Sequence, residues 1–89
     1  MDKDWLIERL TREQAEAENL VRNDRLGPDP VPFGFMNSEW QNLLTQMKAG
    51  DELWFFSSPG HFWENLAGRQ GYCLVRAGRV VSQLVTRMN

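Results

Sequence analysis

Cysteine and histidine are nearly absent from this 89-residue sequence, which has one of each, Cys73 and His61. A lone cysteine cannot form a disulfide within the chain, which favours a reducing compartment over a secreted, disulfide-stapled fold. One histidine and one cysteine cannot complete a tetrahedral zinc site without carboxylates or a second subunit. We therefore expect no metal site, and we expect Cys73 to be a small buried apolar residue.

Motifs that would name a cofactor or a location are also missing. There is no glycine-rich phosphate loop, dinucleotide fingerprint or calcium loop, so we expect no cofactor. No apolar run approaches the roughly 18 to 20 residues that span a membrane. The opening residues, MDKDWLIERLTREQ, are interrupted by charges, unlike a signal peptide. These absences lead us to expect a cytoplasmic protein without a membrane partner.

Net charge is small, about −2 at neutral pH. A dedicated nucleic-acid binder usually presents a basic face, so we expect no nucleic-acid partner. The charges are unevenly spread: residues 2–18 are rich in acids, whereas four arginines and no carboxylate follow Glu64. This distribution favours opposite-signed halves that pack together over a patch that attracts anions.

The first third of the chain predicts a helix and a stiff connector. Residues 1–24 are expected to hold a helix from 4 to about 22, which packs either on its own core or on a partner. Its apolar residues recur at helical spacing: Leu6, Leu10, Ala17 and Val21. Residues 25–36 alternate three prolines, favour polyproline II, and would carry Phe33 and Phe35 back onto the core.

Residues 37–89 predict the core of one small domain that spans residues 1–89. A helix is expected from about 39 to 49, because Ser38 and Gln41 have the spacing of a capping box. Its apolar stripe has the spacing i, i+3, i+4, i+7: Trp40, Leu43, Leu44 and Met47. Gly50 supplies its left-handed end.

The strands follow this helix. We predict a strand over 52–57, a short helix capped by Ser58 with Pro59 at its first position, and a hairpin of strands 71–76 and 79–87. The fold class is α+β: two N-terminal helices, then a three-stranded, mostly antiparallel sheet with a short helix between strands one and two. Whether strands one and two pair parallel or antiparallel stays open.

This sheet is apolar on both faces, unlike a half-exposed antiparallel sheet, which alternates apolar and polar residues. One face is expected to form an interaction surface: Trp54, Phe56, Tyr72, Leu74, Val81 and Val85. Leaving a tryptophan and a phenylalanine in water forgoes several kcal/mol, about the stability of a small domain. Either the N-terminal segments fold over this face, or a second copy or another protein covers it.

A second candidate site lies where the first strand passes into a helix N-terminus, a junction whose free N–H groups favour anions. A ligand or anion site here would use five side chains: Ser57, Ser58, His61, Trp63 and Arg69. A plain cap and tight turn require the same residue types. Nothing resembles a nucleophile elbow or a cysteine-protease signature, so we assign no catalytic residue.

The pattern GDELWFFSS, then W-x-x-LAGR, LVRAGRVV and VTRMN, resembles a group of short bacterial proteins of unassigned activity. The resemblance covers residues 50–89 and implies no catalytic residues. In that group the hairpin turn tends to carry Asp or Asn before glycine, whereas Ala77 stands there in this chain.

We therefore expect a non-enzymatic interaction module that forms a homodimer or binds a protein partner through its apolar sheet face. The alternative is a small ligand-binding or catalytic protein that uses the turn at Ser57–His61.

Overall fold

The computed structural model describes residues 1–89 and has an α+β fold. Its main sheet has four strands in the order β1-β4-β5-β6, and every neighbouring pair is antiparallel. The strands are β1 (Leu6–Leu10), β4 (Glu52–Ser57), β5 (Arg69–Arg76) and β6 (Arg79–Met88). The predicted class is confirmed, but the predicted three-stranded layout is wrong, because β1 joins this sheet and a second, two-stranded sheet forms elsewhere.

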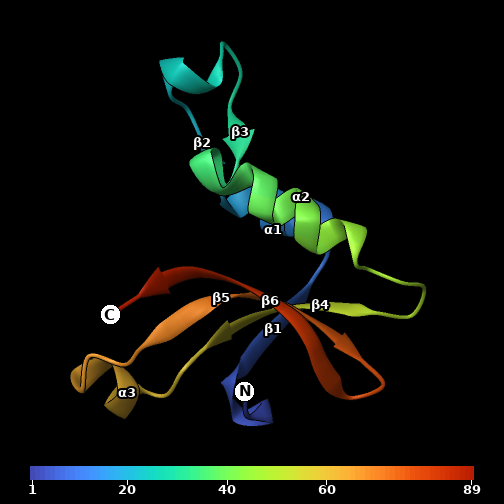
Figure 1. The fold of residues 1–89 in the computed structure, drawn as a ribbon, viewed down its shortest axis with the longest axis vertical. Coiled ribbons are helices and arrows are strands. Elements are labelled where there is room, and N and C mark those ends of the chain that lie inside the picture. Colours follow the sequence, from blue (N-terminus) through green and yellow to red (C-terminus); the bar gives the residue numbers. More distant parts are fainter.

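Three helices and three short 3₁₀ turns connect the strands (Figure 1). The helices are α1 (Arg12–Glu18), α2 (Asn37–Thr45) and α3 (Gly60–Glu64). The turns are η1 (Lys3–Trp5), η2 (Asp24–Leu26) and η3 (Gly34–Met36). Strands β2 (Leu20–Val21) and β3 (Val31–Pro32) form the second sheet.

The single helix predicted from residue 4 to 22 is wrong. Residues Leu6–Leu10 form β1 instead, which pairs with the open edge of β4 and aligns Leu10 with Leu53. Pairing with a sheet edge overrides a weak helical stripe, because intrinsic propensities are small against tertiary contacts. The helix starts only at Arg12 and ends at Glu18, and Thr11 caps it through a capping box with Gln14.

The predicted connector, residues 25–36, is part of a folded segment, residues 20–36, which we call the arm. Pro32 belongs to a short antiparallel ribbon, in which Leu20 aligns with Pro32 and Val21 with Val31. Pro28 and Pro30 lie in the loop between the two strands of this ribbon. The arm projects away from the main sheet (Figure 1). Phe33 returns to the core as predicted and stacks on Trp40, with ring centroids 4.4 Å apart. Phe35 does not, since 65% of it is exposed.

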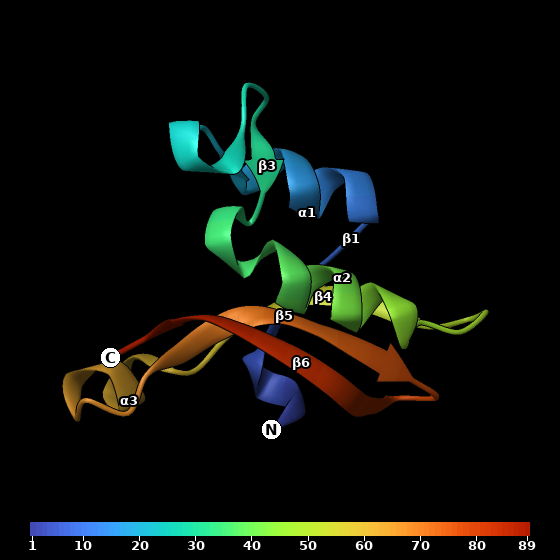
Figure 2. The ribbon, with the colours of Figure 1, turned by 45° about the horizontal axis from the view of Figure 1, so that its top comes forward.

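Helix α2 covers one face of the main sheet (Figure 2). Trp40 and Leu43 are buried against the sheet, and Leu44 and Met47 are partly buried, as their spacing predicts. The predicted cap is wrong: the chain enters α2 directly from η3, so Met36 precedes the helix and the Ser38 hydroxyl donates to Glu39 instead. Trp40 Nε1 donates to Glu16 Oε2 over 2.8 Å, which joins α2 to α1.

Strands β4, β5 and β6 match the sequence pattern closely. β4 has the predicted bounds, and its antiparallel pairing with β5 settles the open question of direction. The hairpin turns at Ala77 and Gly78, whose φ angles of 50° and 77° are those of a type I′ turn. Ser58 does not cap α3, because Pro59 occupies the cap position.

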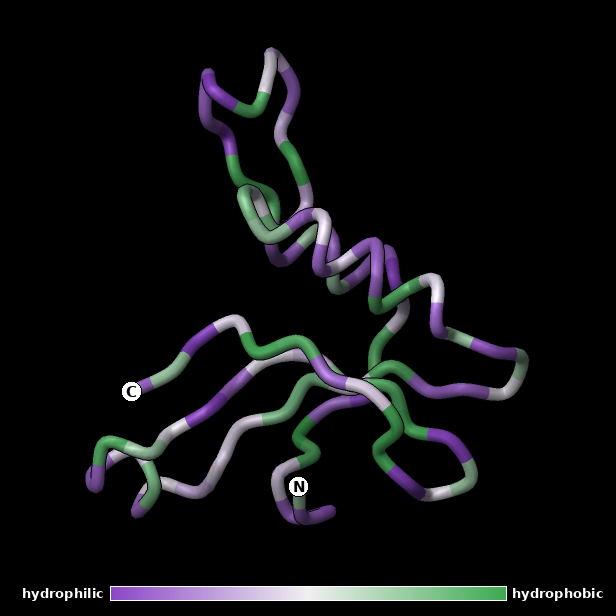
Figure 3. Tube along the Cα trace, in the orientation of Figure 1, coloured by the Kyte–Doolittle hydropathy of each residue, from purple (hydrophilic) through white to green (hydrophobic).

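The N-terminal turn η1 lies on the opposite side of the sheet from α2 (Figure 2). Trp5 and Leu6 pack there against a cluster of Phe56, Cys73 and Val75, all three of which are buried. Hydrophobic stretches lie both where the strands cross and on the arm (Figure 3). The chain thus supplies cover for both sheet faces from its own N-terminal half.

Candidate functional site

The predicted turn site is built mainly from backbone contacts. Ser58 is 5% exposed, and its Oγ accepts a hydrogen bond from the Arg69 N–H at 2.9 Å. The Ser58 N–H donates to the Arg69 carbonyl at the same distance. Its own carbonyl accepts from Trp63 Nε1 over 3.1 Å. These bonds tie the end of β4 to the start of β5 and leave the Ser58 hydroxyl engaged.

The remaining side chains of that turn do not converge. His61 is exposed and packs against the ring of Phe62, with centroids 4.4 Å apart. Arg69 is exposed, and Arg87 rather than Arg69 lies over the Trp63 ring. None of the molecule's five cavities is lined by Ser57, His61 or Arg69.

The six residues predicted as one interaction face lie on two faces. Tyr72 aligns with Phe55 and Leu74 with Leu53, so both point toward α2. Trp54, Phe56 and Val85 belong to the cluster on the opposite face. The alternation along β4 and β5 was predicted correctly, but the faces of the two strands were matched wrongly, because Trp54 lies beside Cys73 and not on the face of Tyr72 and Leu74. A bulge at Val81 changes the hairpin register again, so that Leu74 aligns with Ser82.

The sheet face opposite α2, here called the second sheet face, buries Cys73 and so controls the chemistry of its thiol. Its side chain is fully buried, and burial raises the pKa of the thiol to about 11. Cys73 is therefore a small apolar residue of the core, as its place in a strand predicts. A thiol with so high a pKa is a poor nucleophile.

A groove lies between the two outermost strands of the main sheet. The sheet curls until Lys3, just before β1, comes near the β5–β6 hairpin: its Nζ lies 3.8 Å from the position that a Cβ on Gly78 would take. The groove has a volume of about 480 Å³. One wall comes from the N-terminal segment and consists of Met1, Lys3 and Leu6. The other is a continuous run from the turn into β6: Gly78, Arg79, Val80, Val81, Ser82 and Gln83.

The side-chain charges of this groove are all positive. Lys3 and Arg79 are exposed and have no carboxylate partner within ion-pair distance. No Asp or Glu lines the groove, and Asp2 and Asp4, which flank Lys3 in the chain, are not among its walls. Its apolar walls include Leu6 and Val81, of which Val81 is 45% exposed. The arrangement suits a ligand with apolar groups and negative charge.

Two other polar clusters join elements of the fold. Arg76 donates to both Asp51 oxygens, over 2.8 and 2.7 Å, and these bonds together with the Lys48 N–H lower the pKa of Asp51 to about 2. Asn19 donates to the Tyr72 hydroxyl over 2.8 Å. Burial, with the neighbouring Glu18 carboxylate, raises the pKa of Tyr72.

Comparison of the chain with protein-family models, with curated proteins and with solved structures gives no match. No three His, Cys, Asp or Glu side chains gather closely enough to hold a metal ion. None of the helices is both long and apolar enough to cross a membrane.

Sequence reasoning missed Lys3, Leu6 and Arg79 as site residues. The first two precede or begin a strand that was predicted as helix, so nothing placed them beside the hairpin. No local signal marks this strand: Leu6 and Leu10 have the i, i+4 spacing of a helix. The register shift at Ile7 then places them on opposite faces of the sheet.

Proposed function

We propose that this chain is a non-enzymatic protein-interaction module that binds another polypeptide along the edge of its main sheet. The observation that carries the proposal is the position of β6: it has ten residues and only β5 as a neighbour. An edge strand presents unpaired N–H and C=O groups, which another strand satisfies by pairing with it.

An exposed apolar residue on β6 supports the same proposal. Val81 is 45% exposed and lies at an irregularity in the strand register. Ile7 has a comparable position in β1, at the opposite edge of the sheet. Such bulges commonly stand at sheet edges and redirect side chains. The partner is a second copy of the chain or a different protein, and it meets the sheet at its edge rather than at the buried face around Phe56.

The proposal is tested by capturing partners from the native host on three immobilised chains. These are the wild type, the Val81→Pro variant and the Ile7→Pro variant. Proline is tolerated at bulges of edge strands but removes a donor and obstructs an incoming strand. We expect a partner that the wild type and the Ile7→Pro control retain and that Val81→Pro loses, with circular dichroism showing that all three chains fold. Equal capture by all three chains would contradict binding at β6.

Hydrogen exchange on the wild-type chain gives a reading that requires no variant. We expect β6 amides to gain protection on partner binding, because pairing shields them from water. Sedimentation of the chain alone distinguishes self-association from binding to another protein. Protection gained only on the arm or on α3 would place the interaction elsewhere.

A further inference from the structure

Building on the proposed function, we infer that the groove beside β6 takes an extended acidic and apolar segment of another protein, which pairs with β6 as a fifth strand. The groove lies between β6 and the N-terminal segment, which lines it with Met1, Lys3 and Leu6, so an added strand would fill the space between them. This inference specifies the chemistry of the partner that the proposed function leaves open.

The backbone of β6 faces this groove. Residues 78–83 line it without interruption, so its wall is the strand edge itself rather than side chains from one face. Arg76 and Arg79 flank the two-residue turn, and in such hairpins this pair exchanges both ladder bonds. The next residue, Val80, then directs its N–H and C=O away from β5, toward the groove. At about 3.3 Å per residue, this wall accommodates roughly five residues of an extended chain.

Charge selects an acidic segment. Lys3 stands on one wall and Arg79 on the other, and no carboxylate lies between them. Complementary charge at the rim of an interface speeds association and rejects partners of like charge. The other side chains of the groove include Leu6, Val80 and Val81, which favour apolar residues at alternate positions of the incoming strand.

The same charges disfavour a second copy of this chain. β6 contains Arg79 and Arg87 and no carboxylate, so two paired β6 strands would gather four cations without an anion. An edge-to-edge homodimer is therefore opposed by repulsion in every register that places these arginines opposite one another. A partner segment that alternates apolar residues with Asp or Glu meets no such repulsion.

Titration of the wild-type chain with defined peptides, followed by amide chemical shifts, tests the inference. The probe is a capped ten-residue peptide that alternates Val or Ile with Glu and Thr. One matched peptide carries Lys in place of Glu, and another carries N-methyl groups on alternate residues, which removes donors. We expect shifts at residues 79–83 with the acidic peptide, weakened by added salt, and about tenfold or weaker binding of the other two.

Charge reversal in the chain supplies the matched control. Lys3→Glu with Arg79→Glu changes the net charge by as much as Arg22→Glu with Arg25→Glu. Arg22 directly follows β2 and Arg25 lies in η2, on the arm that projects away from the sheet (Figure 1). All four side chains are exposed, so both variants are expected to fold. We expect the first variant to weaken binding of the acidic peptide about tenfold or more, and the second to change it less than twofold.

Several results would overturn the inference. Absence of binding at millimolar peptide, equal binding of the Lys peptide, or undiminished binding of the N-methylated peptide would each do so, as would a homodimer whose β6 amides are protected. The proposed function fails separately, when Val81→Pro keeps every partner. If Val81→Pro loses the partner while Lys3→Glu with Arg79→Glu keeps it, edge binding stands and the acidic segment is wrong.

Discussion

Ala77 holds a backbone conformation that its side chain disfavours. Its φ angle is 50°, and residues other than glycine, asparagine and aspartate rarely adopt the left-handed region. The conformation persists because the turn must join β5 and β6 in two residues, and a type I′ turn matches their twist. A residue that suits the turn better should therefore stabilise the hairpin without changing any contact.

We expect Ala77→Asn to raise the free energy of unfolding by about 0.5–1 kcal/mol, because asparagine tolerates this region more readily. Urea denaturation measures the change. Ala67→Asn is the control, since Ala67 is also exposed but does not have a positive φ angle. Equal stabilisation by both substitutions would show that the turn geometry is not the cause.

Cys73 reports on the burial of the second sheet face. Its pKa of about 11 leaves roughly one thiol in a thousand ionised at pH 8, and the side chain is fully buried. We expect a water-soluble disulfide reagent to label it only through opened forms of the protein, and at once in denaturant. Rapid labelling of the native chain would contradict the packing of β5 beneath η1.

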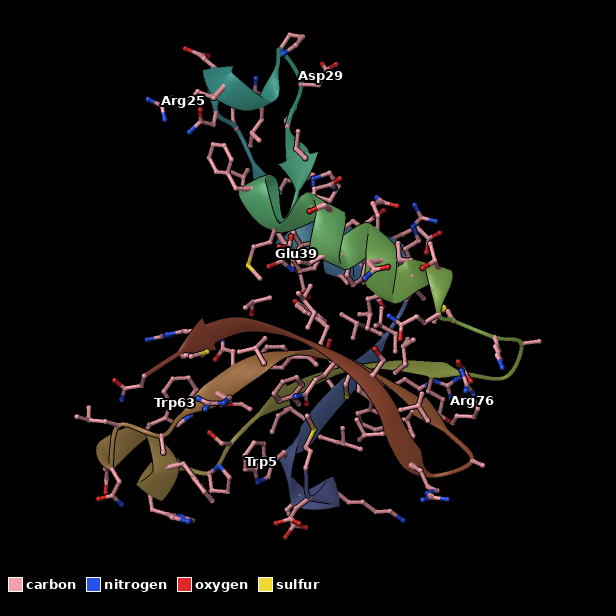
Figure 4. All side chains as sticks on the ribbon, in the orientation of Figure 1. Trp5, Arg25, Asp29, Glu39, Trp63 and Arg76 are labelled. Carbon is pink, nitrogen blue, oxygen red and sulfur yellow. The ribbon has the colours of Figure 1, made fainter.

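At the scale of elements, the contact between Asp51 and Arg76 joins the loop after α2 to the end of β5 (Figure 4). The pKa of Asp51 falls from 3.8 to about 2 on folding, so the folded state favours the carboxylate. Its contribution to stability is therefore complete above pH 4 and is lost as the pH falls through 2.

We expect Asp51→Asn to destabilise the chain at pH 6, and the difference from wild type to shrink as the pH approaches 2. Thermal unfolding across that range measures the difference. Asp29→Asn is the control, because Asp29 is an exposed residue of the arm and accepts no side-chain hydrogen bond in the structure. A difference that persists unchanged at pH 2 would mean that the carboxylate charge is not responsible.

Elements with strong local signals were predictable from the sequence, and elements made by pairing were not. β4 has its predicted bounds because its continuous run of large apolar residues, 53–56, is soon followed by Pro59, which cannot continue a strand ladder. β1 was missed because Leu6 and Leu10 have helical spacing, and only pairing with the open edge of β4 makes this segment a strand. The strands of the arm and the strand β1 thus form only through contacts between segments that are distant in the sequence.

The candidate site was less predictable than the fold, for the same physical reason. Sequence alternation assigns residues to two faces within a strand, but it does not align one strand with the next. Tyr72 and Leu74 were therefore placed with Trp54 and Phe56, although they face α2. Lys3 and Arg79 share a groove only because the sheet curls, which no local pattern encodes.

At the scale of the whole molecule, the chain is thin and extended for its length. Its radius of gyration is 13.7 Å, against about 12 Å for a typical domain of this size, and its shortest dimension is 17 Å. Only 16 of its 89 residues are buried. A fold of this shape leaves edges and the arm free for binding, while its stability depends on a few large side chains.

Trp5 is one of these side chains, because it covers the second sheet face from η1 (Figure 4). Its ring meets Phe62 edge-on, with centroids 5.3 Å apart, and so joins the N-terminus to α3. We expect Trp5→Ala to cost about 2 kcal/mol, less than the 3–5 kcal/mol typical of a fully buried tryptophan.

The labelling of Cys73 measures this cost through the population of opened forms. A loss of about 2 kcal/mol corresponds to labelling roughly 30-fold faster than in the wild type. Trp5→Phe should restore most of the protection, whereas Phe35→Ala, which removes a ring that is 65% exposed on the arm, should leave the rate unchanged. If Trp5→Ala labels no faster than Phe35→Ala, the N-terminal turn does not protect this face, and the curled sheet alone keeps Cys73 from water.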